Sequence, residues 1–411
     1  MTYEVDLVAI KACLLVSLYP FCLLIGDIKI RIAITICFLS AALLLQNRTL
    51  FCIVLLLFLF SEPARIKKIS RKFLILSGIL SPFVLAYINV DSIIGRIFIW
   101  INIFSNVHKV PPFGFGIETF KFKYAEWQAE YFVQNVSWSK NHFVADAPSF
   151  AFNEPLHFYV EYGVTAIIVF SLLIYFNIHV IMRKSVPIIQ ALSLSNLCIF
   201  AFALVSYPLH STWILFILLS NHILMIAIWY KRTVYGFVLI TIIFSFILID
   251  YQKYTQAKEK WLYAQSLPVN ANLEKEELYN SAYTALCRNQ YFLYDYCSFL
   301  LNEQKPDKVL SIGNTQRIYF NQYEHSLLMG SAYLQKNKMN SAKAYFLFAH
   351  YIIPNRLIPL HHLLNIAKTS HDTFQIKNYA EMIIATPIKV TSPVVTKIKG
   401  EAQLILNQNS K

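Results

Sequence analysis

The chain has 411 residues, of which 56% are hydrophobic and 14% are charged, and its mean hydropathy is +0.48. A soluble domain usually has about 25% charged residues, so this composition excludes an ordinary soluble enzyme and indicates a membrane protein. The formal net charge is +13. Many lysines and arginines stand in short runs beside apolar segments, as membrane topology requires, so we expect no nucleic-acid partner.

Eight apolar segments predict a bundle of membrane-spanning helices. Several are shorter than the roughly 20 residues that a full span needs, and the third is the weakest. The polar stretch QNRT at 46–49 is either a tight turn between two spans or a break within one long segment. The segments are 12–26, 32–45, 50–60, 73–90, 156–181, 187–207, 213–230 and 233–250.

Basic residues fall in alternate connections between these segments, and the positive-inside rule places such connections in the cytoplasm. The other short connections hold only Arg48. Eight spans with both ends outside satisfy this pattern, which puts the long connection and the C-terminal part outside the cytoplasm. The basic connections contain Lys29 and Arg31, then Arg65, Lys67, Lys68, Arg71 and Lys72, then Arg183 and Lys184, then Lys231 and Arg232.

These features divide the chain into four expected parts. About four transmembrane helices in 1–90 precede a large outward loop in 91–155, and about four more in 156–250 precede a soluble domain in 251–411. The expected fold class is therefore all-α, with a polytopic membrane helix bundle, a large loop and a C-terminal helical domain.

The C-terminal part carries the pattern of a tetratricopeptide repeat, in which paired helices pack through small and large side chains at fixed offsets. Stacked helix pairs of this kind offer a concave surface to a protein partner or to a neighbouring domain. A degenerate pair at 269–302 precedes the clearest unit. The clear unit matches at Gly330, Tyr333, Ala342, Phe346, Ala349 and Pro354, and a weaker one follows at Leu363, Ala367, Ala380 and Ile383.

Polar residues near the start of the fifth segment share one face of a helix. Asn153, His157 and Glu161 recur at i, i+4 and i+8. Ionisable groups at the mouth of a transmembrane helix indicate a functional site. His157 and Glu161 are either a proton acceptor with its orienting carboxylate or a simple pair on the helix surface. His210, in SYPLHST between two spans, is a second outward-facing candidate.

Two arginines are candidates for binding an anion. Arg48 stands where a chain turn meets the outer leaflet, as a snorkelling interfacial residue or as part of an anion clamp. Arg96 lies in the apolar run SIIGRIFIW, where the nearest acid along the chain is Asp91. A buried arginine needs an anionic partner, and a phosphate-bearing ligand would supply one.

The sequence predicts neither a metal nor another cofactor. Five of the seven cysteines lie in apolar segments, where cysteine behaves as a small hydrophobe, and their spacing matches no metal site. The G-x-G in FGFGIETF is too short and misplaced for a dinucleotide fingerprint.

Several elements, in order, resemble the O-antigen ligase and O-antigen polymerase superfamily, which includes bacterial protein O-oligosaccharyltransferases. LLLQNRTLFCIVLLL is similar to the family's "SR" helix start, and DSIIGRIFIW resembles its "SxGR…W" element, with Arg48 and Arg96 on the two arginines. FGFGIETFKFKY resembles the following "GxGxxxF" element of the Bacteroidetes branch. FNEPLHFYVEYG is similar to the motif H-N-x-x-L-x-x-L-x-E-x-G, on which the matching residues are Asn153, Leu156, Glu161 and Gly163.

The resemblance runs from about residue 32 to the C-terminus and includes the tetratricopeptide-like tail, and it has two departures. The leading histidine of the motif, the family's proposed base, is Phe152 here. Family members also carry several spans before the "SR" element that this chain is expected to lack. With Phe152 at the histidine position, His157 becomes the candidate base.

The resemblance implies transfer of a glycan from an undecaprenyl-diphosphate carrier to a hydroxyl of a lipid, a glycan or a protein. It implies no nucleotide sugar and no cofactor, and it places a multi-pass protein in the bacterial inner membrane with its C-terminal domain in the periplasm. Arg48 and Arg96 would stabilise the leaving diphosphate, and His157 would take the acceptor proton. Asn153, Glu161 and His210 are the candidate substrate-binding residues.

A second hypothesis comes from a different class of protein. The chain would be a non-catalytic membrane receptor or scaffold whose tetratricopeptide-like tail binds an envelope partner. Phe152 and the smaller number of spans favour this hypothesis, and the acceptor and the sugar stay open under the first one.

Overall fold

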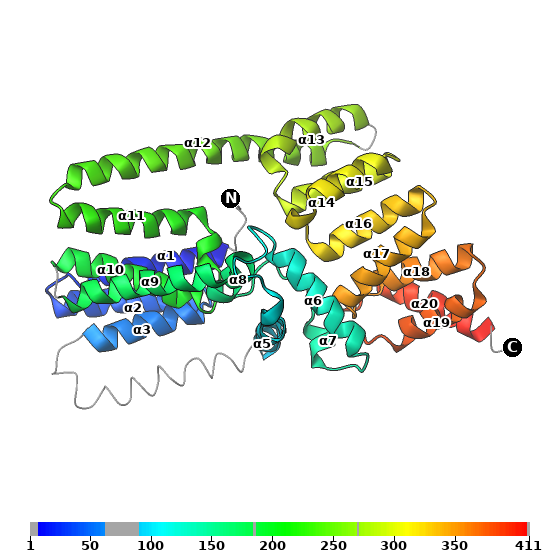
Figure 1. Ribbon diagram of the computed structural model, residues 1–411, viewed down its shortest axis with the longest axis horizontal. Coiled ribbons are helices and arrows are strands. Elements are labelled where there is room, and N and C mark those ends of the chain that lie inside the picture. The colour runs from blue at the N-terminus through cyan, green and yellow to red at the C-terminus, as the bar shows by residue number, and fades with distance from the viewer. Residues whose placement is uncertain (1–6, 62–89, 184–185, 269–270, 409–411) are drawn as a thin grey trace. The chain divides into compact units, whose positions relative to one another are not determined.

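A computed structural model describes residues 7–61, 90–183, 186–268 and 271–408 of the chain. Within these ranges the chain forms 19 α-helices and short 3₁₀ turns without any strand, so the all-α prediction is confirmed (Figure 1). The predicted apolar segment 73–90 lies outside the described residues except for its last position.

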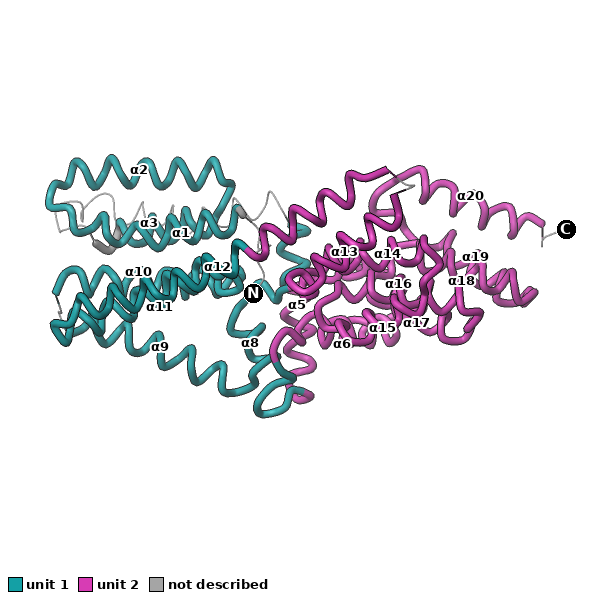
Figure 2. Tube along the Cα trace, turned by 90° about the horizontal axis from the view of Figure 1, so that it is seen from above, with its two compact units in different colours: residues 1–96, 110–116, 150–252 teal, residues 97–109, 117–149, 253–411 magenta. Residues whose placement is uncertain are grey.

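The chain forms two compact units, and each unit draws on segments that are distant in the sequence (Figure 2). The predicted outward loop 91–155 is divided between them. The first unit contains residues 1–96, 110–116 and 150–252, and the second contains residues 97–109, 117–149 and 253–411.

Mostly apolar helices make up the described part of the first unit. The side chain of Asp27 caps one of them by accepting a hydrogen bond from the Lys29 backbone N–H over 2.8 Å. The helices are α1 (Leu7–Cys22), α2 (Ile28–Leu44), α3 (Arg48–Ser61), the start of α5 (Val90–Ser105), α8 (Glu154–Tyr162), α9 (Val164–Met182), α10 (Pro187–Ala203), α11 (Thr212–Trp229) and the first part of α12 (Thr233–Ser266).

The polar stretch QNRT forms a tight turn between α2 and α3. Gln46 has a φ of 50°, and the Asn47 backbone N–H donates to the Ala42 carbonyl over 2.9 Å, which closes α2. The Asn47 side chain then accepts a hydrogen bond from the Leu50 N–H over 2.9 Å and caps α3. Arg48 is consequently the first residue of α3.

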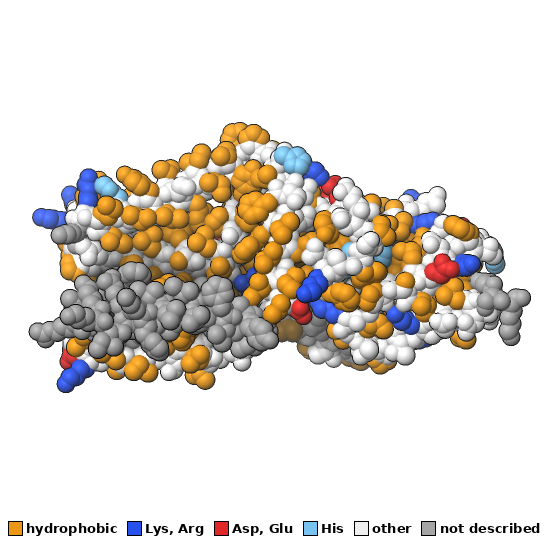
Figure 3. All heavy atoms as spheres, turned by 90° about the horizontal axis from the view of Figure 1, so that it is seen from below, with side chains coloured by type: hydrophobic (Ala, Val, Ile, Leu, Met, Phe, Trp, Pro, Cys, Tyr) orange, Lys and Arg blue, Asp and Glu red, His pale blue; other side chains and the backbone are white. Residues whose placement is uncertain are grey.

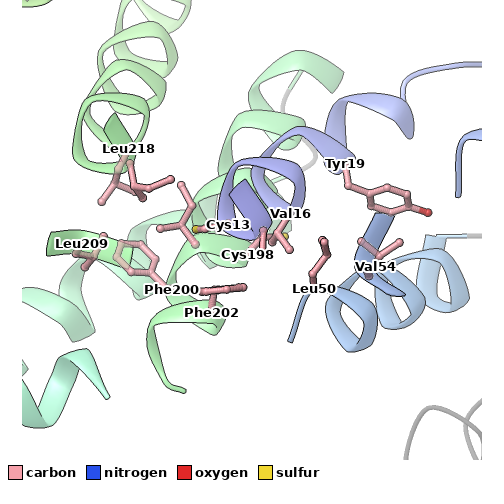
Figure 4. Packing of buried hydrophobic residues seen from close by; sticks show 14 of the residues in the cluster. Cys13, Val16, Tyr19, Leu50, Val54, Cys198, Phe200, Phe202, Leu209 and Leu218 are labelled. Atoms are coloured by element: carbon pink, nitrogen blue, oxygen red, sulfur yellow. The ribbon is translucent and has the colours of Figure 1, made fainter. Parts of the chain in front are cut away.

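The core of the first unit lies where α1, α3, α10 and α11 meet (Figure 4). Its side chains are aliphatic, aromatic or thiol groups, and those from α1 and α10 include two buried cysteines. Close packing of this kind holds apolar helices together even where lipid surrounds them. The labelled members are Cys13, Val16, Tyr19, Leu50, Val54, Cys198, Phe200, Phe202, Leu209 and Leu218.

Three helices in the described part of the chain are long and apolar enough to cross a membrane: Val164–Met182, Thr212–Trp229 and Thr233–Ser266. Their outward side chains are themselves apolar, and Phe237 and Phe246 of α12 are 60% and 69% exposed. In Figure 3, hydrophobic side chains cover much of the visible surface at the left, with lysine and arginine gathered at its end. A lipid environment would remove the cost of exposing this surface to water.

Consecutive helices also pack on each other in the second unit. The tetratricopeptide register of these helices stays a prediction. The helices are the end of α5, α6 (Phe120–Gln134), α7 (Lys140–Val144), the end of α12, α13 (Asn272–Leu286), α14 (Gln290–Asn302), α15 (Pro306–Thr315), α16 (Gln322–Gln335), α17 (Met339–Ile352), α18 (Ile358–Thr369), α19 (Thr373–Ala385) and α20 (Pro393–Gln408).

The middle of the predicted loop is helical and packs on the C-terminal helices. Gln128 of α6 is buried, and its side-chain amide donates to the carbonyl of Ile352 over 2.6 Å and to that of Asp146 over 2.8 Å. Ala125 and Ala129 share a hydrophobic cluster with residues of α17. These contacts explain why 117–149 belongs to the second unit.

One carboxylate joins α12 to the helices that follow it. The Asp295 Oδ2 atom accepts hydrogen bonds from Trp261 Nε1 over 2.7 Å, Gln265 Nε2 over 3.0 Å and the Tyr279 hydroxyl over 2.6 Å. Burial raises the pKa of Tyr279, and the neighbouring Asp295 raises it further. Tyr279 therefore stays a donor at physiological pH.

Gly330 of α16 allows a close approach to α17. A Cβ atom at this position would lie 2.6 Å from Cε1 and 2.8 Å from Cζ of Phe346. Gly400 of α20 is a natural comparison, because a Cβ atom there would meet no described atom within 4 Å. Both glycines lie inside helices of the second unit.

Replacing Gly330 with alanine should overpack the α16–α17 contact and lower the free energy of unfolding by about 1–3 kcal/mol. The matched change Gly400→Ala should raise it by about 0.5–1 kcal/mol, because alanine favours the helix. Denaturant unfolding of the purified full chain would measure both. Equal effects of the two substitutions would contradict the close contact at Gly330.

Candidate functional site

The short helix α8 carries the polar face that the sequence predicts. Asn153 caps its start: the side-chain oxygen accepts a hydrogen bond from the Leu156 N–H over 3.0 Å. The side-chain amide of Asn153 also donates to the Leu204 carbonyl over 2.9 Å, which fixes α8 to the end of α10. The geometry thus assigns Asn153 to positioning the helix.

The predicted continuous helix from residue 156 to 181 is wrong, because the chain turns at Gly163. This glycine has a φ of 63° and separates α8 from α9, so the candidate span begins at Val164. Left-handed φ values are accessible to glycine at little cost. His157 and Glu161 therefore lie on a separate helix that precedes the span.

Segment 110–116 lies against the end of α8 through three backbone hydrogen bonds. Phe115 N–H donates to the Val160 carbonyl over 3.0 Å, Gly116 N–H to Glu161 over 2.9 Å, and Val164 N–H to Pro112 over 2.9 Å. The approach leaves no room for side chains. A Cβ atom at Gly114 would lie 2.2 Å from the Glu161 backbone, and one at Gly163 would lie 2.0 Å from the Pro112 carbonyl oxygen.

Two carboxylates and two imidazoles form a chain of contacts inside the first unit. His157 Nε2 lies 3.0 Å from His210 Nε2 and 3.3 Å from Glu161 Oε1. His210 Nδ1 lies 3.3 Å from both oxygens of Glu154. Glu154 Oε1 also accepts a hydrogen bond from the Leu209 backbone N–H over 2.8 Å. We call these four residues, Glu154, His210, His157 and Glu161, the histidine–carboxylate chain.

Aromatic rings enclose the histidine–carboxylate chain. The ring centroid of Phe150 is 4.6 Å from that of His210, and Phe158 is stacked on His210 at 5.4 Å. Tyr207 is stacked on Phe150 at 4.5 Å. Glu154, His157 and Glu161 are buried, and in such surroundings both the hydrogen bonds and the charges of the chain act more strongly than in water.

Burial favours the neutral form of His157. Removal from water lowers its pKa, and the neighbouring His210 lowers it further. Glu161 and Glu154 act in the opposite direction. The net effect leaves a neutral imidazole near pH 7, which can accept or pass on a proton.

Arg96 lies close to the same aromatic cluster. Its Nη1 atom donates to the Val205 carbonyl over 2.9 Å, and its Cζ atom lies 4.8 Å from the ring centroid of Phe152. Burial lowers the pKa of Arg96, Tyr207 raises it, and the positive charge of Arg48 lowers it. The guanidinium stays protonated at physiological pH despite these effects. The two arginines thus interact electrostatically inside one unit.

The structure brings together residues that the sequence predicted separately, and it adds Glu154. His157, Glu161 and His210 meet directly, and Arg96 and Asn153 lie on the adjoining segments. Glu154 follows Asn153 directly, where an acid in the first turn of a helix is common. Its partner His210 is 56 residues away, so neither spacing nor periodicity indicated its role.

A second polar network lies among the apolar helices α9, α10 and α11. Asn196 donates to Asn177 over 3.1 Å and accepts from Asn221 over 2.9 Å, and His222 lies 3.3 Å from Asn177. His222 Nδ1 is 2.7 Å from the Leu218 carbonyl. Hydrogen bonds of this kind typically join transmembrane helices. The sequence did not predict this network, because these few polar residues lie within apolar segments.

No cluster of three or more His, Cys, Asp or Glu residues suited to a metal ion occurs in the part of the chain that the structure describes. Comparison with known proteins finds no family model, no curated protein and no solved structure that matches the chain.

Gly163→Ala should disturb the site, because alanine would need a φ of 63° and its Cβ would meet the Pro112 carbonyl. Strain of this kind costs about 1–3 kcal/mol, to which the steric conflict adds. The control is Gly26→Ala, where a Cβ would meet no described atom within 4 Å. Thermal unfolding of both variants in detergent should show a lower midpoint for Gly163→Ala, and an unchanged midpoint would contradict the close approach of segment 110–116.

Proposed function

We propose that the protein is a membrane glycosyltransferase, similar to O-antigen ligases, that moves a glycan from an undecaprenyl-diphosphate carrier to a hydroxyl acceptor. The observation that carries the proposal is the buried histidine–carboxylate chain beside Arg96. A hydroxyl acceptor must lose its proton as it attacks the glycan, and a neutral histidine held by a carboxylate is suited to take that proton. The resemblance of Arg48, Arg96, Asn153 and Glu161 to family motifs points the same way.

The arginines would act on the leaving group. Negative charge develops on the diphosphate as its bond to the sugar breaks, and a nearby guanidinium stabilises that charge. The Val205 carbonyl and the Phe152 ring fix the orientation of Arg96 before any donor binds. Because Arg96 is already oriented, little conformational entropy is lost when it stabilises the leaving diphosphate, and the barrier to reaction is lower.

The apolar helices would accommodate the lipid carrier. The exposed apolar surface of α9, α11 and α12 suits an inner-membrane protein, and the diphosphate would then lie at the membrane surface, near α8. We propose that the second unit lies in the periplasm, where its stacked helices would bind a protein partner. The acceptor is a hydroxyl of a lipid, a protein or a growing glycan.

One observation favours the alternative of a non-catalytic scaffold. Glu154, His157 and Glu161 are at most 4% exposed, so the histidine–carboxylate chain would also serve to hold α8 against the segment around His210. Under this alternative the tetratricopeptide-like tail would recruit an envelope partner, and the four polar residues would contribute stability but no chemistry.

Deletion of the gene should cause lipid-linked glycan to accumulate in the host membrane, and expression of the wild-type chain should remove it. Arg96→Lys should fail to do so, because an ammonium group cannot reproduce the contacts of a guanidinium. The control is Arg183→Lys, at the exposed end of α9. Complementation by Arg96→Lys equal to that of the wild type would remove Arg96 from the site, and absence of accumulation in the deletion strain would favour the scaffold.

The proposed topology places the C-terminus outside the cytoplasm, because the basic connections alternate along the chain. A reporter enzyme that is active only outside the cytoplasm should therefore be active when it is fused to the C-terminus. The matched control is the same reporter inserted after Arg232, in the basic connection before α12, where it should be inactive. The reverse pattern of activity would contradict the topology.

A further inference from the structure

The two imidazoles of the histidine–carboxylate chain are held in defined tautomers. His210 Nδ1 lies 3.3 Å from both oxygens of Glu154, and carboxylate oxygens accept hydrogen bonds, so we assign the proton to this nitrogen. The neutral His210 ring then presents an acceptor at Nε2. The Leu209 backbone N–H donates to the Glu154 carboxylate and holds it in place. The carboxylate in turn accepts from Nδ1 of His210, and this contact defines the His210 tautomer.

The proton between the two rings therefore belongs to His157. Its Nε2 lies 3.0 Å from the acceptor Nε2 of His210, a distance that requires one proton between the two nitrogens. The same N–H has a second acceptor nearby, because Glu161 Oε1 is 3.3 Å away. His157 can thus donate to His210 or to Glu161 with a small change of ring orientation.

His210 is the most exposed member of the histidine–carboxylate chain. Its side chain is 16% exposed, whereas those of His157 and Glu161 are 4% and 6% exposed and that of Glu154 is fully buried. A group that receives a proton from a substrate must come within about 3 Å of the donor oxygen. Burial therefore argues against direct contact between His157 and an acceptor hydroxyl.

We propose that His210 is the catalytic base, that Glu154 positions it, and that His157 and Glu161 form a latch that releases it. The inference rests on the proposed glycan transfer and deepens it by reassigning the base from His157. In the resting state the latch is closed, with the N–H of His157 on His210. When an acceptor binds, the N–H turns to Glu161, and His210 Nε2 becomes available.

The chemical step then balances. The O–H bond of the acceptor breaks, and its proton passes to His210 Nε2, while Glu154 stabilises the imidazolium that forms, as a carboxylate does for histidine in hydrolase triads. The acceptor oxygen forms a bond to the anomeric carbon of the donor. The bond between that carbon and the diphosphate breaks, and the diphosphate leaves with the electron pair. His210 afterwards returns the proton to water or to the released diphosphate.

The test compares isosteric variants in membrane vesicles from the deletion strain, to which purified full-length chain is added. The probe is the undecaprenyl-diphosphate-linked glycan that accumulates in those membranes, and its disappearance is followed from pH 5 to pH 9. His210→Gln should slow it by roughly 100-fold or more, the usual contribution of a general base. His157→Gln keeps an N–H donor beside Glu161 and should slow the reaction much less than His210→Gln does, because His157 does not receive the proton in this assignment. The opposite order of the two variants would overturn the assignment of the base.

Glu154→Gln tests the positioning role separately. Glutamine keeps the shape and the acceptor for the Leu209 N–H, but it no longer stabilises the imidazolium. We expect the rate to fall and the acid limb of the pH–rate profile to move to lower pH, because the base becomes easier to deprotonate. A merely structural role would lower the rate without moving the limb, and that outcome would overturn the role of Glu154.

Failure of the inference differs from failure of the proposed function. If wild-type protein consumes the lipid-linked glycan but the histidine variants show the opposite order, the function stands and His157 is the base. If wild-type protein does not consume it, both proposals fall. Thermal unfolding of each variant in detergent separates loss of folding from loss of chemistry, and His210→Asn serves as a second variant at the base if His210→Gln does not fold.

Discussion

The candidate site of the first unit depends on the burial of two carboxylates beside two imidazoles. A desolvated carboxylate is costly unless hydrogen bonds compensate for the lost water, and Glu154 obtains these from the Leu209 backbone and from His210. Glu161 has His157 within 3.3 Å. Each carboxylate thus depends on a histidine, and the histidines depend on each other. Removal of one member would leave the others buried with incomplete hydrogen bonding. The free-energy cost of a buried polar group without a partner is larger than the net stabilisation from one hydrogen bond.

Backbone geometry at both ends of α8 makes this burial possible. Phe152 has a φ of 53° just before the helix, and Gly163 has a φ of 63° just after it. Between these two positive φ values α8 has only nine residues. The polar face of this short helix can therefore point inward independently of the orientation of the apolar span that follows. A helix continuous with α9 would have its orientation set by lipid-facing side chains instead. The tight backbone contact of segment 110–116 with Glu161 and Gly163 then holds the short helix in place.

The sequence predicted the helical class and much of the site, for reasons that are local. The spacing of Asn153, His157 and Glu161 follows the helical repeat, so their common face was evident without any knowledge of the fold. His210 was visible as a polar residue between apolar segments. Glu154 was not, because its role depends on a contact with a distant part of the chain. The break at Gly163 was also missed, since hydropathy continues across a glycine whose φ is set by tertiary contacts.

Phe152 stands where the motif that the chain resembles has a histidine, and its surroundings favour an aromatic ring. The Phe152 ring lies under the Arg96 guanidinium, with 4.8 Å between Cζ and the ring centroid, and meets Tyr207 edge-on at 5.3 Å. An aromatic face attracts a cation there, whereas a protonated imidazole would repel it. Residue 152 therefore supports the arginine. In the glycan transfer that we propose, the base would then be another histidine, and His210 is suited to that role because Glu154 can stabilise its cation while the rings of Phe150 and Phe158 pack against it.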